Sequence, residues 1–165
     1  MKAAAKDSRM NALADLYNWQ TDFFKSVLDG VPDTDAHDRM GTKANHIAWL
    51  AGSLVEQRFE LANELTDSSH KQQANELFKD NQGIKDGITY PALAQFKADW
   101  DIISPIGGDA LLNATTEKLD SILKMPGMEM PLYEYVLFTI YREANCIGQI
   151  ALWRRLLGHE AMKYM

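Results

Sequence analysis

Four long stretches of the chain place apolar residues at helical spacing, with polar residues between them. These stretches cover residues 7–29, 42–65, 91–103 and 131–157. Apolar side chains at i, i+3, i+4 and i+7 give a helix one face to bury. Gly30, Pro32 and Gly158 follow stretches of this kind, where such residues end helices. The pattern predicts an all-α protein, a four-helix bundle.

Local signals refine the ends of these helices. Thr42 is a suitable N-cap for the second helix, and Thr115 begins one more short helical turn. Pro105 followed by the glycines at 107 and 108 is expected to kink or break the third helix. Residues 125–131 (MPGMEMP) read as a loop or a short hairpin-like excursion.

The connection between the second and third helices is long and polar. It covers residues 66–90 and contains a pattern for a short helix around residues 71–79. Ordinary bundle connections are shorter. The connection could therefore carry the chain from one end of the bundle to the other, so these two helices need not be antiparallel neighbours.

Composition narrows the class of protein. A chain of 165 residues with 46% apolar residues is consistent with one domain over residues 1–165. A single cysteine excludes a disulfide framework, and a net charge of −6 argues against nucleic-acid binding. No apolar run reaches the ~20 residues of a membrane span. Lys6, Asp7 and Arg9 interrupt any signal-peptide core, so a cytoplasmic protein is expected.

The fourth helix carries polar groups among apolar ones. Its apolar residues cover more than one side, as in a helix that is central or covered by a second subunit. Steps of three and four place five residues on one face: Thr139, Arg142, Cys146, Gln149 and Trp153. Buried polar groups need partners or water. From the second helix, His46 could face the same cavity.

Two segments resemble the DinB/YfiT-like family. Residues 142–158 (REANCIGQIALWRRLLG) resemble its last helix, which typically reads His-x-x-x-His-x-Gly-Gln-Ile before an Arg- and Leu-rich end. Residues 45–50 (NHIAWL) resemble its second-helix motif. The resemblance implies a four-helix bundle, often a homodimer, with a divalent metal held by three histidines. It also implies metal-dependent transfer involving low-molecular-weight thiols, thiol-dependent isomerisation or hydrolase-like chemistry.

The family's ligand set is incomplete in this chain. His46 matches the second-helix ligand, but Arg142 and Cys146 stand where the two histidines of the last helix belong. An arginine has no lone pair to offer a metal, and its positive charge repels a dication by several kcal/mol at contact distance, roughly 4 per unit pair. We therefore predict that the family metal site is lost and expect no cofactor. The alternative is a variant zinc or nickel site that uses His46 and Cys146.

Each of these residues has two interpretations. His46 is either a packed, hydrogen-bonded histidine or a ligand-binding group. Cys146 is either a small buried residue or a reactive thiol, a candidate nucleophile whose pKa Arg142 would lower. Arg142 either pairs with a carboxylate, such as that of Glu56, or anchors an anionic ligand. Gln149 is expected to bond across the bundle. Gly148 is expected to permit close helix contact.

These features support two functional hypotheses. The first is a degenerate DinB-like protein that binds a small ligand, with His46, Arg142, Cys146 and Gln149 as candidate ligand-binding residues, or serves as a structural homodimer. The second is a metal- or thiol-dependent transferase- or isomerase-like enzyme that uses His46 and Cys146. Whether the protein is an enzyme is left open. Expected partners are a second copy and a small molecule or thiol, with neither nucleic acid nor membrane.

Overall fold

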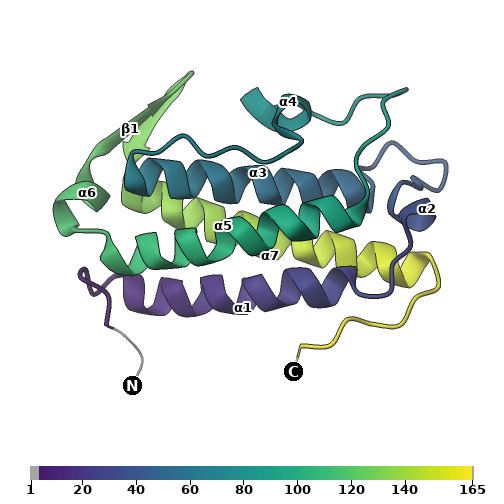
Figure 1. Ribbon diagram of the computed structural model, residues 1–165, viewed down its shortest axis with the longest axis horizontal. Coiled ribbons are helices and arrows are strands. Elements are labelled where there is room, and N and C mark those ends of the chain that lie inside the picture. The colour runs from purple at the N-terminus through teal and green to yellow at the C-terminus, as the bar shows by residue number, and fades with distance from the viewer. Residues whose placement is uncertain (1–3, 165) are drawn as a thin grey trace.

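Helices make up most of the protein in the computed structural model, which describes residues 4–164. The four long helices are α1 (Met10–Leu28), α3 (Ile47–Thr66), α5 (Leu93–Asn113) and α7 (Leu132–Leu156), and they lie alongside one another (Figure 1). The short elements are α2 (Asp33–Ala36), α4 (Asn75–Phe78), η1 (Lys79–Asn81), α6 (Thr116–Asp120), β1 (Ile122–Met125) and β2 (Met128–Pro131). The predicted all-α class is confirmed apart from this small hairpin. Residues 1–3 and 165 of the predicted domain lie outside the described residues.

Each long helix packs against two others. Helix α5 contacts α1 and α3, and α7 contacts the same two helices from the other side. One buried apolar cluster combines the start of α1, the end of α3, the end of α5 and the start of α7. Helices α1 and α7 therefore run in one direction and α3 and α5 in the other. Residues 67–92 return the chain along the length of α3 to the start of α5 (Figure 1).

Helix α3 begins five residues later than Thr42, the predicted N-cap. The Thr42 hydroxyl instead donates to the Arg39 carbonyl (2.8 Å) and accepts from the Ala44 amide (3.2 Å), which closes a turn before the helix. The N-cap is His46, whose Nδ1 accepts a hydrogen bond from the backbone N–H of Trp49 (3.0 Å). The prediction was wrong because a ring nitrogen takes the role that usually belongs to a hydroxyl.

Helix α5 continues through Pro105 to Asn113, so of the two expected outcomes, a kink or a break, the break does not occur. Pro105 lies on the exposed side, so water can bond the carbonyl that lost its partner. On the buried side, the Tyr17 hydroxyl donates to the Ser104 carbonyl (3.0 Å). A side chain at Gly107 would clash with that hydroxyl. The glycine thus permits close packing of α5 on α1 rather than ending the helix.

The predicted excursion at residues 125–131 is an antiparallel hairpin. Strands β1 and β2 pair from Ile122 opposite Pro131 to Met125 opposite Met128. Gly127 has a φ of +83°, which suits glycine in the tight turn after Pro126. The predicted cap of the preceding short helix is also confirmed, because the Thr115 hydroxyl accepts from the Lys118 amide.

A buried ion pair joins α3 to α7 in the middle of the helices. Arg58 bonds Glu143 through Nε (2.7 Å) and Nη2 (3.0 Å), and both side chains are fully buried. Its remaining N–H groups reach Thr21 Oγ1, Ser104 Oγ and the Tyr17 carbonyl, so all five donors are used. The guanidinium also lies between two aromatic rings, those of Tyr17 (3.8 Å) and Trp100 (3.6 Å). The pair therefore ties all four long helices together.

Candidate functional site

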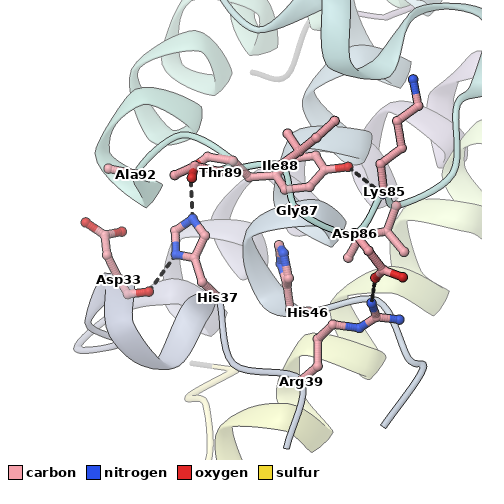
Figure 2. A pocket seen from close by; sticks show the side chains of 12 residues that line it. Asp33, His37, Arg39, His46, Lys85, Asp86, Gly87, Ile88, Thr89 and Ala92 are labelled. Atoms are coloured by element: carbon pink, nitrogen blue, oxygen red, sulfur yellow. Dashed lines mark hydrogen bonds and ion pairs between the residues drawn. The ribbon is translucent and has the colours of Figure 1, made fainter. Parts of the chain in front are cut away.

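A cavity of about 480 Å³ lies where α2, the start of α3 and the segment before α5 meet (Figure 2). Its polar and charged lining comes from Asp33, His37, Arg39, His46, Lys85 and Asp86. Ile84, Ile88, Tyr90 and Ala92 add apolar surface. Concave sites of this size and mixed lining are typical of small-molecule binding.

His46 lies in the cavity as a hydrogen-bond donor. Because Nδ1 accepts the Trp49 N–H, the hydrogen of the neutral ring is on Nε2. The side chain is 6% exposed, and within residues 4–164 Nε2 has no hydrogen-bond partner. Burial, and then the charge of His37, lower the pKa of His46 from 6.5 to about 4. At neutral pH the cavity therefore contains an uncharged imidazole N–H.

His37 faces two backbone carbonyls. Its Nδ1 lies 2.6 Å from the Asp33 oxygen and its Nε2 lies 2.9 Å from the Tyr90 oxygen (Figure 2). Carbonyl oxygens only accept hydrogen bonds, so the ring of His37 is a donor in this part of the structure. The His37 and His46 ring centroids are 5.4 Å apart. Two adjacent histidines thus have different roles: His37 contacts backbone carbonyls, and His46 caps α3.

Fixed contacts support the rest of the cavity wall. Arg39 donates to Asp86 Oδ1 (2.7 Å), to the Ala44 carbonyl (2.9 Å) and to the Lys43 carbonyl. Asp33 Oδ1 accepts from the Leu93 amide (2.8 Å) at the start of α5. These bonds join α2 and the loop after it to the segment before α5, so the cavity is part of the packed structure.

Arg142 does not reach the cavity and does not bond a carboxylate. Its guanidinium donates to Gln57 Oε1 (2.7 Å) and to Ser53 Oγ (2.6 Å) on α3. The predicted pairing with a carboxylate is therefore wrong. The carboxylate next in sequence, Glu143, is taken by Arg58. Ser53 stands seven residues after His46, which is about 10 Å along a helix.

Cys146 lies in the apolar core rather than in the cavity. It is 5% exposed and packs in the larger buried cluster. Burial raises the pKa of its thiol, and the nearby Arg142 only partly offsets this effect. The geometry matches the first of its two interpretations, a small buried residue, and gives no support to a thiolate at neutral pH.

The remaining residues of the predicted face also lie away from the cavity. Gln149 is exposed and donates to Asn145 Oδ1 (2.7 Å) one turn earlier on α7, so its expected bond across the helices is absent. A Cβ at Gly148 would meet nothing within 4 Å, so this glycine makes no close helix contact inside the chain. Trp153 is buried and donates to the Asn45 carbonyl (2.9 Å), which places it beside the start of α3.

The side chains at the three family ligand positions do not fit the family's metal. Arg142 has no lone pair, the Nδ1 lone pair of His46 accepts the Trp49 N–H, and burial favours the protonated thiol of Cys146. In the part of the chain that the structure describes, no three His, Cys, Asp or Glu side chains come together in an arrangement that could hold a metal ion. The geometry therefore offers no support for a variant site of His46 and Cys146.

Sequence reasoning missed His37 as a site residue. Its partner Tyr90 is 53 residues away, and no spacing or motif links the two. It also missed the Arg58–Glu143 pair, although a charged residue inside the apolar stripe of a helix is a usable signal for a buried ion pair. His46 was recognised, but as a metal ligand or packed histidine rather than as a cap that leaves one donor free.

Comparison of the chain with protein-family models and with curated proteins gives no match. Within residues 4–164, no helix is long and apolar enough to cross a membrane. The functional proposal therefore rests on the residues and geometry of the cavity.

Proposed function

We propose that the protein is a DinB-like four-helix bundle that binds a small molecule in the cavity at His46, without the metal of the family. One observation carries the proposal: an imidazole N–H on a side chain only 6% exposed has no partner and lines a cavity of about 480 Å³. Nε2 is not among the fully buried side-chain atoms without a partner, so it is accessible from the cavity, where the acceptor of a ligand can bond it in place of water.

The family assignment is supported by the two motif segments and by the arrangement of the helices. Residues 45–50 and 142–158 carry the resemblance. The long connection that returns the chain between α3 and α5 is the kind of crossover found in some four-helix bundles. The side chains at the three ligand positions support the absence of the metal. Arg142 has no lone pair, the Nδ1 lone pair of His46 accepts the Trp49 N–H, and burial favours the protonated thiol of Cys146.

The test combines elemental analysis with a ligand screen. Protein purified without added metal should contain no stoichiometric divalent ion. In NMR spectra of the ¹⁵N-labelled protein, small-molecule fragments should shift the resonances of His37, His46 and Tyr90 together. The proposal would be contradicted if the wild-type protein contained a stoichiometric ion and a His46 variant did not. So would a fragment library that leaves the cavity resonances unmoved.

His46→Asn is the informative variant. Asparagine is a good N-cap, so the start of α3 is retained, but its shorter side chain removes the donor from the cavity. Fragment binding should weaken while the spectrum stays folded. His70→Asn is the matched control, because His70 is exposed and lies outside the cavity.

We also propose a homodimer formed through α1 and α7. Its support is a set of large apolar side chains exposed on these adjacent helices: Leu16, Trp19, Phe138, Tyr141, Leu152 and Leu156. Gly148 lies among those of α7 with open space around it, so the backbone of a second copy could approach closely. Exposed apolar patches of this kind mark interaction surfaces.

A further inference from the structure

The exposed side of α7 is complementary to itself about the middle of the helix. It begins with an acidic residue in the first turn, Glu134, and ends with a basic residue in the last turn, Arg155. Both are exposed, and within residues 4–164 neither has an ion-pair partner. They are equally far from the point between Ala144 and Asn145, which are also exposed. A second α7 that runs in the opposite direction therefore brings opposite charges to the same level.

The charges at the two ends of α7 favour this antiparallel arrangement. Glu134 of each copy lies opposite Arg155 of the other, so two pairs of opposite charge form at the rim of the contact. In a parallel arrangement each of these residues would face its own equivalent, and like charges repel. The helix dipoles act in the same sense, because antiparallel helices bring their opposite ends together.

The side chains between the two ends match in size in the same register. Leu137 lies opposite Leu152 of the second copy, and both are exposed. Tyr141, which is 67% exposed, lies opposite Gly148, where the space around the backbone is open. A large side chain can enter the space above a glycine, so the two helices can approach closely. A parallel arrangement would instead place ring against ring and glycine against glycine.

This self-complementarity identifies the partner as a second copy of the chain. A two-fold interface uses the same patch on both molecules, so each residue of the patch must suit another residue of that patch. A different protein would place no such constraint on the order of residues along α7. From the charges and the side-chain sizes we infer that two copies pack with their α7 helices antiparallel, around a two-fold axis at the level of Ala144 and Asn145. The inference rests on the homodimer proposed above, because it specifies how the two copies are arranged.

Single cysteines test the register. Ala144→Cys places a thiol beside the axis, where the two copies can bring their Cα atoms within the ~4.4–6.8 Å of a disulfide. Leu137→Cys is the matched control, because its two thiols would lie about 22 Å apart along the helices. In oxidised glutathione, Ala144→Cys should form a covalent dimer on electrophoresis without reductant, and Leu137→Cys should not, although it still sediments as a dimer. The wild-type chain, whose single cysteine is buried, should not cross-link either.

Charge reversal tests the contacts at the ends of α7. Glu134→Arg and Arg155→Glu each turn two attractive pairs into two repulsive ones, so each should raise the dissociation constant of the dimer about tenfold. A chain with both substitutions has opposite charges in exchanged positions and should recover the wild-type constant. Asp109→Arg makes the same change of charge at an exposed position on α5 and should leave the constant unchanged.

Failure of this arrangement and failure of the proposed dimer give different results. A stable dimer in which Ala144→Cys does not cross-link, or in which Leu137→Cys does, would overturn the antiparallel register while the dimer remained. A double charge variant as weak as the single ones would overturn it too. A wild-type chain that sediments as a monomer and an Ala144→Cys chain without a covalent dimer would remove the dimer itself.

Discussion

At the scale of single residues, the core contains the Arg58–Glu143 ion pair, in which every N–H group of the arginine side chain donates a hydrogen bond. Arg58 has five N–H groups and five acceptors, with aromatic rings on both faces. Removing two buried charges from water costs several kcal/mol each, so the pair persists only because its geometry is complete. Breaking one partner leaves the other charge buried and uncompensated.

Glu143→Gln should therefore lower the free energy of unfolding by about 3–5 kcal/mol, measured by urea denaturation. The matched control is Asp101→Asn, which breaks the exposed Lys25–Asp101 pair. That control should change stability by less than about 1 kcal/mol. Equal effects of the two variants would mean that the buried pair does not hold the helices together.

Cys146 should react slowly with thiol reagents in the folded protein. Its burial hides the sulfur and raises the pKa of the thiol, so little thiolate forms at neutral pH. Labelling with a chromogenic disulfide should be slow at pH 7 in buffer and complete within seconds in urea. Fast labelling of native protein would revive the reactive-thiol interpretation, and Cys146→Ala would then show whether any activity depends on it.

At the scale of elements, the start of α3 couples helix capping to the cavity. His46 uses one ring nitrogen for the helix and leaves the other for a ligand. The same side chain makes stability depend on pH. Its pKa is about 4 in the folded protein and about 6.5 in the unfolded chain, so between these values the unfolded state binds more protons.

The free energy of unfolding should fall as the pH is lowered from 6.5 to 4, and His46 should contribute about 3 kcal/mol to that fall. His46→Asn keeps a cap and should flatten this part of the profile. His46→Ala should flatten it too, and should cost about 1 kcal/mol at pH 7 for the lost cap. His70→Asn provides the control, and an equally flat profile for it would contradict the assignment to His46.

Helix positions were largely predictable from sequence, because periodicity and caps are local. Helices α1 and α7 begin and end within a few residues of their predicted limits, and the hairpin falls where it was expected. The error at the start of α3 is local, because His46, four residues after Thr42, caps the helix instead. At Pro105 a distant residue is involved: the helix does not end there, and Tyr17 packs closely against that part of it.

At the scale of the whole molecule, the exposed apolar residues of α1 and α7 lead to a prediction about assembly. Sedimentation equilibrium should find a dimer, because a second copy would cover the exposed apolar side chains of these two adjacent helices. Leu152→Glu, at 60% exposure on α7, should convert it to a monomer with an unchanged helical spectrum. Ile102→Glu is the control, since Ile102 is 57% exposed on α5, and should leave the dimer intact. A monomeric wild type would remove the proposed interface.

The candidate site was only partly predictable. His46 was singled out from the sequence, whereas Arg142, Cys146 and Gln149, which helical spacing placed on one face, lie in three different environments outside the cavity. Spacing along a helix says which side chains point the same way. It does not say which neighbour each will meet, because the partners come from other helices.

By itself the sequence determined the helical class and the approximate limits of the long helices, since these depend on residue type and on spacing within a few turns. Only the tertiary structure decided that His37 meets Tyr90 across 53 residues and that Arg58 meets Glu143 across 85. It also decided that the capping bond of His46 turns a potential metal ligand into a donor. The physical reason is that hydrogen-bond roles depend on which groups packing brings together.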